Sequence, residues 1–159
     1  MKQFNVEIGE TVKLSKTIGE SDVYGFAGIT GDFSGNHVNE EHMKRSKYGQ
    51  RIAHGALVVG FMSTASTLMF SRHIEKYVSQ GVTPASLGYD RVRFLGPVFF
   101  GDTITVTYTI KALDLESARS RSDLSVSNQR GELVAVAEHI MKWVKIEPTV
   151  PADNGSHRA

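Results

Sequence analysis

Residues 52–70 are apolar but rich in small side chains. The stretch reads IAHGALVVGFMSTASTLMF, so glycine, alanine, serine and threonine are interspersed with bulky apolar residues. A helix that is apolar on most sides is normally buried, and small residues let a neighbouring backbone or a ligand approach. Glycine inside a helix costs about 1 kcal/mol relative to alanine, so Gly55 and Gly60 indicate a close contact there. We predict one long buried helix that the rest of the chain must cover.

The second half of the chain has the alternating pattern of β-strands. Residues 90–94 alternate, and residues 103–111 place apolar side chains on one face and threonines on the other. Residues 123–127 alternate again, and residues 133–146 are long enough for a full strand with a bend or bulge. Because helix and strands each need a partner for their apolar faces, this pattern predicts an α+β fold with a curved antiparallel sheet around the helix.

The remaining segments are predicted from caps and helix breakers. Residues 2–14 suit a first strand or an extended arm, and a short helix is expected over residues 21–31. The glycines within residues 31–35 predict a loop that can aim side chains inward. Residues 71–86 are predicted to be a polar linker.

Length and composition limit the classes of function. The 159 residues suit one domain, predicted over residues 1–147, and residues 148–159 are predicted to be a disordered tail. A net charge of +1 gives no sign of a nucleic-acid partner. The absence of cysteine excludes a disulfide, a thiolate metal site and a cysteine nucleophile. With no secretory signal and no apolar run near the ~20 residues of a membrane span, we expect a cytoplasmic protein without a membrane partner.

Candidate chemistry is concentrated in the segment GDFSGNH, residues 31–37. By residue type alone, Asp32 is either a turn-capping carboxylate or a functional one, and His37 is either structural or a proton-transfer group. A carboxylate and an imidazole on one loop can share a water and move its protons. A helix that begins near Gly55 would offer free N–H groups to a developing oxyanion. Together these parts suit the addition of water to a polarised double bond.

Other kinds of site have less support. His37 and His42 are five residues apart, which is not the HExxH spacing and would set them off one helix face, so no metal site is predicted. Ser63 is not in a GxSxG motif, and no GxGxxG motif or P-loop occurs.

An arginine pair in the predicted strand 90–94 is a further candidate. In a regular strand Arg91 and Arg93 share one face with Tyr89. This face is either a solvated sheet surface or a phosphate contact.

Over nearly its whole length the chain resembles the MaoC-like dehydratases, and within them the short R-specific enoyl-CoA hydratases. The segments IGETVKLSKTIGESDVYGFAGITGD, IAHGALVVGFMS and GPVFFGDTITV carry this resemblance. The hydratase signature of the family has the form GDxNPxH, and here it reads GDFSGNH. Ser34-Gly35 stands where the family has Asn-Pro, and glycine lacks the fixed φ of proline.

The resemblance implies a hot-dog fold and hydration of trans-2-enoyl-CoA to (R)-3-hydroxyacyl-CoA, with the reverse dehydration. It implies Asp32 and His37 as the catalytic pair, with the backbone N–H of Gly55 as the oxyanion donor. Ser63, close to this pair, Phe33 and Ser34 would line the substrate pocket, and His54 would be a structural neighbour. The only small-molecule partner implied is the acyl-CoA substrate, with no other cofactor and no metal. A homodimer or higher homo-oligomer is expected.

Three alternatives remain open at the level of the sequence. The chain could dehydrate acyl-carrier-protein thioesters, bind acyl-CoA without catalysis, or be a thioesterase of the same fold. Retention of Asp32 and His37 argues against a non-catalytic protein, and the GDFSGNH segment argues against the thioesterases, which lack it. Acyl chain length is not indicated.

Overall fold

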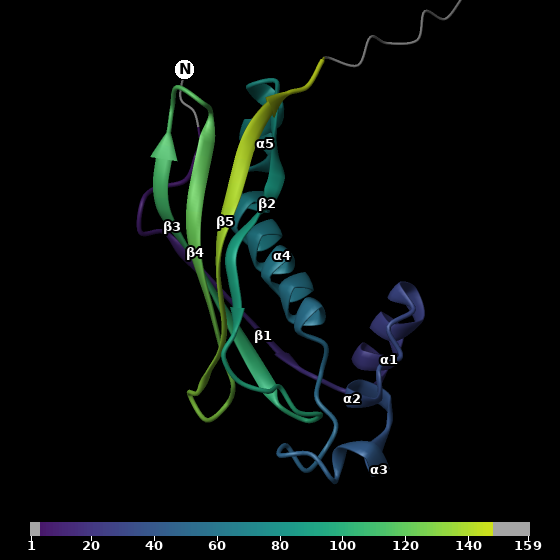
Figure 1. Cartoon of the computed structure of the whole chain (residues 1–159). Coiled ribbons are helices and arrows are strands. Elements are labelled where there is room, and N and C mark those ends of the chain that lie inside the picture. The colour runs from purple at the N-terminus through teal and green to yellow at the C-terminus, as the bar shows by residue number, and fades with distance from the viewer. Residues whose placement is uncertain (1–3, 148–159) are drawn as a thin grey trace, which may run out of the picture.

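In the computed structural model, residues 4–147 are described and form one antiparallel sheet with helices on one of its faces (Figure 1). The strands are β1 (Thr11–Thr17), β2 (Val82–Phe94), β3 (Thr103–Asp114), β4 (Arg119–Ser127) and β5 (Leu133–Lys145). The helices are α1 (Glu20–Thr30), α2 (Gly35–Val38), α3 (Glu40–Met43), α4 (Gly55–Ser71) and α5 (Ile74–Ser79). The predicted tail, residues 148–159, lies outside the described residues.

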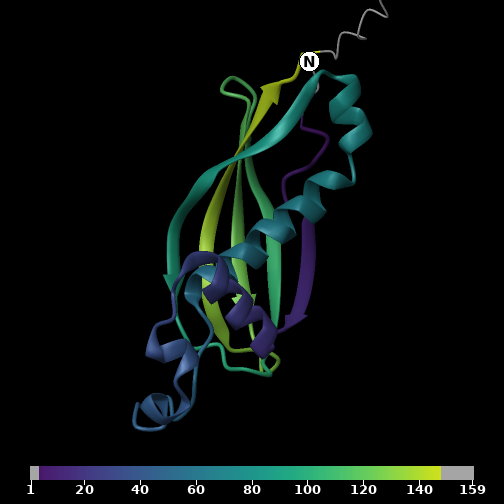
Figure 2. The same ribbon diagram turned by 90° about the vertical axis from the view of Figure 1, so that its right-hand side faces the viewer.

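The five strands follow the order β1-β3-β4-β5-β2, and every neighbouring pair is antiparallel. β1 and β2 are therefore the two edges of the sheet. Helix α4 crosses one face of the sheet, as the two views show (Figures 1 and 2). The predicted α+β architecture, a sheet packed around one central helix, is confirmed.

The core lies between α4 and the sheet. Met62 and Met69 of α4 are completely buried, as are Ile104, Val106 and Tyr108 of β3. The threonines that alternate with these β3 residues point to the opposite face, where several share hydroxyl hydrogen bonds with β1. The two-faced pattern predicted for residues 103–111 is thus confirmed. No helix within residues 4–147 has the length and hydropathy needed to cross a bilayer.

Helix α4 is buried on one face rather than on most sides. It begins at Gly55, and its outer face exposes small residues such as Ala56, Gly60 and Thr64. A Cβ on Gly55 would lie 2.6 Å from the ring of Phe94, so the close contact expected there exists. At Gly60 no described atom outside the neighbouring helix backbone lies within 4 Å of such a Cβ, so the close approach expected at this position stays a prediction.

The predicted polar linker over residues 71–86 was wrong. This segment contains α5 and the first part of β2. Helix α5 has only six residues, and it buries Tyr77, whose hydroxyl donates a hydrogen bond to the carbonyl of Phe4. Pro84 is tolerated in β2 because an edge strand needs fewer backbone donors. Neither element has a strong local signal, because each depends on its tertiary partner.

Two bulges interrupt β2, and they change which side chains share a face. The register with β5 shifts between Ser86 and Gly88 and again between Asp90 and Arg93. Tyr89 is opposite His139, whereas Arg93 is opposite Val136. His139 and Val136 are three residues apart on β5 and so point to opposite faces.

The predicted common face for Arg91, Arg93 and Tyr89 was therefore wrong. Tyr89 faces the core, whereas Arg91 lines a groove on the outer face of the sheet with Lys111 and Glu138. The cause is the extra residue in the second bulge, where Arg91 has a φ of 53°. Strand alternation read from the sequence fails wherever such a residue is inserted.

Candidate functional site

The end of α1 places Asp32. Gly31 closes the helix with a φ of 79°, a left-handed conformation that suits glycine, and its N–H donates to the carbonyl of Ala27 at 2.8 Å. The chain then turns, and Asp32 Oδ1 accepts the N–H of Ser34 at 3.2 Å. Asp32 therefore caps the turn through one oxygen. Its side chain is about half exposed (52%), so the carboxylate stays accessible.

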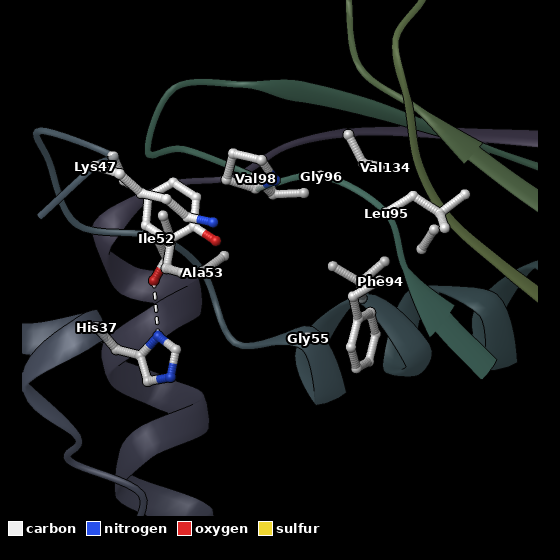
Figure 3. Close-up of a pocket in the computed structure, with 14 residues that line it drawn as sticks. His37, Lys47, Ile52, Ala53, Gly55, Phe94, Leu95, Gly96, Val98 and Val134 are labelled. Atoms are coloured by element: carbon white, nitrogen blue, oxygen red, sulfur yellow. Dashed lines mark hydrogen bonds between the residues drawn. The ribbon is translucent and has the colours of Figure 1, made fainter.

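His37 comes from the short helix α2, so the predicted loop ends at Ser34. The Nδ1 atom of His37 lies 2.8 Å from the carbonyl oxygen of Ile52 (Figure 3, dashed line). A carbonyl can only accept, so Nδ1 carries the proton of the neutral ring and Nε2 carries its lone pair. His37 therefore presents a basic nitrogen on its far side.

His54 is the N-cap residue of α4 and is 2% exposed. Its Nε2 lies 2.9 Å from the backbone oxygen of Asp32, so Nε2 carries the proton and donates. Its ring stacks on that of His37, with centroids 3.7 Å apart. Its Nδ1 is buried and has no hydrogen-bond partner among the described residues. The expectation of a structural neighbour understates its position, because it contacts both members of the predicted pair.

Three polar atoms lie within 4.8 Å of one another at this site. They are one carboxylate oxygen of Asp32 and one ring nitrogen each of His37 and His54. Two imidazoles and a carboxylate can form a metal site. In this cluster, however, the His54 nitrogen that lies 3.9 Å from Asp32 Oδ2 is Nε2, which already donates to the Asp32 carbonyl and so has no lone pair for a metal. A gap of no more than 4.8 Å between Asp32 and His37 suits one bridging water with hydrogen bonds of about 2.8 Å. The geometry favours a proton-transfer site.

Gly55 lies at the edge of the same site, at the start of α4. No described acceptor bonds its N–H, as is normal for the first turn of a helix. The helix dipole adds a partial positive charge at this end. His37 and Gly55 both line a cavity of about 340 Å³, and the Phe94 ring packs beside Gly55 (Figure 3). The other apolar walls of this cavity include Val58, Val98 and Val134.

The structure does not bring all predicted pocket residues to this cavity. Phe33 is 57% exposed, and Ser34 is the N-cap of α2; neither lines the cavity. Ser63 is eight residues beyond Gly55, or about 12 Å further along the helix, and lines a different cavity. The predicted position of Ser63 close to Asp32 and His37 stays a prediction.

Phe94 was missed in the sequence, and the contacts of His54 were underestimated. Phe94 meets Gly55 only through the pairing of β2 with β5, for which no local pattern exists. His54 did carry a signal, because it directly precedes Gly55, near which the helix was expected to begin.

Comparisons with known proteins identify the family of this chain. The model of the MaoC like domain matches residues 3–129. The (R)-specific enoyl-CoA hydratase of Rhodospirillum rubrum is 36% identical over 109 residues, which cover 69% of each chain. The 3-hydroxybutyryl-CoA dehydratase of Methylorubrum extorquens is 33% identical over 147 residues, or 92% of this chain and 87% of that one.

The same likeness extends to solved structures. The (R)-hydratase from A. caviae involved in PHA biosynthesis is 25% identical and superposes with a TM-score of 0.69, covering 86% of this chain and 96% of that one. The fold is therefore the hot-dog fold that the sequence predicted. Because the family model spans most of the chain, this protein belongs to the MaoC-like domain family.

Proposed function

We propose that this protein is a hydro-lyase that adds water to a trans-2-enoyl-CoA and catalyses the reverse dehydration. The supporting observation has two parts: a carboxylate oxygen of Asp32 and a ring nitrogen of His37 lie within 4.8 Å of each other, and His37 lines one cavity with Gly55, whose N–H has no described acceptor. The relatives named as enoyl-CoA hydratase and hydroxyacyl-CoA dehydratase support the same reaction class. The proposed product is the (R)-3-hydroxyacyl-CoA.

In the proposed mechanism one water bridges Asp32 and His37. Its oxygen bonds to C3 of the substrate while one of its protons passes to this pair. The electrons of the double bond move onto the thioester oxygen, which the N–H of Gly55 and the dipole of α4 stabilise. The enolate then collapses and C2 takes a proton from the same pair, so that H and OH are added without net proton release. No metal or redox group takes part.

The activity test uses crotonyl-CoA and follows the loss of enoyl-thioester absorbance. Asp32→Asn keeps the shape of the side chain but removes its charge, so we expect kcat/KM to fall by about 10² to 10⁴. Asp123→Asn is the matched control, because Asp123 pairs with Lys111 on strands β3 and β4, in the outer-face groove. The proposal fails if the wild type hydrates no enoyl thioester of any chain length, or if Asp32→Asn is fully active.

The same assay separates the alternatives. Crotonyl thioesters of CoA and of an acyl carrier protein carry the same pantetheine arm, so the ratio of their kcat/KM values reports the carrier. A higher value with the carrier protein would favour the dehydratase of carrier-protein thioesters. Tight acyl-CoA binding without turnover would identify a non-catalytic binding protein.

The proposed unit is a homodimer. Strand β2 is a sheet edge that bears exposed Leu87 and Phe94, and the outer face of α4 offers small residues for close helix packing. We expect sedimentation velocity to give a dimer mass, and Gly60→Arg on α4 to shift it to the monomer. Gly28→Arg on α1 serves as the control. A monomeric wild type at assay concentration would contradict the proposal.

A further inference from the structure

A second cavity lies between α4 and the edge of the sheet. Its volume is about 290 Å³, and its lining includes Ser63, Ser66, Ser86 and Met141. These residues belong to α4, β2 and β5. The same three elements line the first cavity at other positions, with Gly55 of α4, Phe94 of β2 and Ala135 of β5. The two cavities therefore follow one another along the space between α4 and the β2–β5 edge.

One pair of side chains occupies the interval between the two cavities. Tyr89 of β2 and His139 of β5 are direct cross-strand partners on the core face. On β2, Tyr89 lies between Phe94 of the first cavity and Ser86 of the second. On β5, His139 lies between Ala135 and Met141. Their rings stack with centroids 4.2 Å apart and an interplanar angle of 7°.

This pair spans the space from the sheet to the helix. The hydroxyl of Tyr89 is buried against Ser63 and Ser66 of α4, although no described residue meets it at hydrogen-bond geometry. The ring therefore reaches from the His139 ring on the sheet to the surface of α4. A smaller side chain at position 89 would leave this interval open.

His139 holds the pair rigidly. It is completely buried, with Nδ1 3.0 Å from the Tyr108 hydroxyl and Nε2 2.8 Å from the Ser86 hydroxyl. Both ring nitrogens are thus satisfied by neutral partners. Burial lowers the pKa of His139 to about 4, so the ring stays uncharged at neutral pH.

We propose that Tyr89 is the specificity-determining residue that ends the acyl part of the site and restricts the enzyme to short acyl chains. The inference rests on the proposed hydratase function. A thioester carbonyl at Gly55 directs the acyl chain along the apolar wall of Val58 and Phe94 toward Tyr89. The second cavity lies beyond Tyr89. A longer acyl chain enters this cavity only when the Tyr89 ring is removed.

The test compares crotonyl-CoA with trans-2-dodecenoyl-CoA. We expect the wild type to prefer crotonyl-CoA, and Tyr89→Ala to raise the kcat/KM ratio of the long to the short substrate by about tenfold or more, within the range that a few methylenes contribute in a pocket. Tyr89→Phe retains the ring and is expected to retain the wild-type ratio. Tyr89→Ala combined with Ser63→Leu, which refills the second cavity, is expected to return the ratio toward the wild type.

Folding and activity are controlled separately. Tyr89→Leu keeps more of the packing and still fails to span the interval, so it is used if Tyr89→Ala unfolds. Binding of butyryl-CoA and dodecanoyl-CoA, measured by calorimetry, gives a second readout that needs no turnover. The proposed role of Tyr89 is overturned if the wild type accepts both chain lengths equally. It is also overturned if folded Tyr89→Ala or Tyr89→Leu leaves the ratio of long to short substrate unchanged in both assays. If the wild type hydrates no thioester, the proposed function fails. The ratio of the affinities for dodecanoyl-CoA and butyryl-CoA still tests whether Tyr89 limits the acyl chain length.

Discussion

The imidazole rings of His37 and His54 stack with their centroids 3.7 Å apart, and this contact joins two helices of the site. His37 belongs to α2, and His54 is the residue from which α4 starts. The Nε2–H of His54 also donates to the backbone of Asp32. One side chain therefore contacts both Asp32 and His37 and directly precedes Gly55.

We expect His54→Ala to lower kcat for crotonyl-CoA hydration by about tenfold or more with a smaller change in KM, because misplacing catalytic groups slows chemistry more than binding. Stability should also fall by about 2 to 4 kcal/mol, since a buried ring and its hydrogen bond are lost. Urea melts and steady-state kinetics measure the two effects. His42→Ala, at an exposed position of α3, is the control. If His54→Ala folds and keeps the wild-type kcat, His54 has only a structural role.

Gly55→Ala tests the packing at the start of α4. The added Cβ would lie 2.6 to 2.8 Å from three ring carbons of Phe94, so the ring must move and the first turn of the helix is disturbed. We expect a loss of about 1 to 3 kcal/mol in the free energy of unfolding and a lower kcat/KM. Gly28→Ala in α1 has nothing within 4 Å of its Cβ and should gain up to about 1 kcal/mol. Equal effects at both positions would contradict this account.

The free energy of unfolding should decrease at acidic pH because His139 is buried in its uncharged form. Its pKa is about 4 in the folded protein because of burial, against 6.5 in the unfolded chain. Between these values the unfolded chain takes up a proton that the folded protein does not, so stability drops as pH falls from about 6.5 to about 4 and its loss then levels off. The shift corresponds to about 3 kcal/mol. His139→Gln has no titrating group at this position, so its free energy of unfolding, measured with denaturant, should change less between about pH 6.5 and about pH 4. An equally steep pH dependence in this variant would exclude His139 as the cause.

Metal removal should not affect turnover. The Nε2 of His54 donates to the Asp32 carbonyl, which leaves the cluster of Asp32, His37 and His54 poorly suited to a metal. We expect protein dialysed against EDTA to hydrate crotonyl-CoA at the untreated rate, with elemental analysis to confirm that metal is absent. A loss of activity that zinc or iron restores would instead assign these three residues as ligands.

Gly35→Pro should restore the residue that the family signature has at this position. Gly35 is the first residue of α2, where proline is favoured, and Ser34 has φ −54° and ψ 140°, which suit a residue before proline. A Cβ at Gly35 would lie 3.3 Å from Cδ2 of His42, and this exposed ring must shift by a few tenths of an ångström. We expect a gain of about 0.4 to 1 kcal/mol from reduced freedom of the unfolded chain, with kcat kept or raised. Gly28→Pro, inside α1, should instead cost about 3 kcal/mol. Thermal melts compare the two, and a destabilising Gly35→Pro would show that the loop needs glycine.

The sequence by itself determined the elements whose signals are local. The end of α1 at Gly31 follows from the conformational freedom of glycine, and the two faces of β3 follow from strict alternation. The GDFSGNH segment likewise predicted that Asp32 and His37 would approach each other, because both lie on one short turn.

Only the tertiary structure decided the features that depend on strand pairing. The bulges of β2 turn Tyr89 to the core and Arg93 to the outside, and the same pairing brings Phe94 onto Gly55. Helix periodicity also could not show that Ser63 lies in a separate cavity, because a helix repeats its faces without indicating what covers them. The physical reason is that the partners are distant in sequence, and one inserted residue in an edge strand reverses which side chains meet.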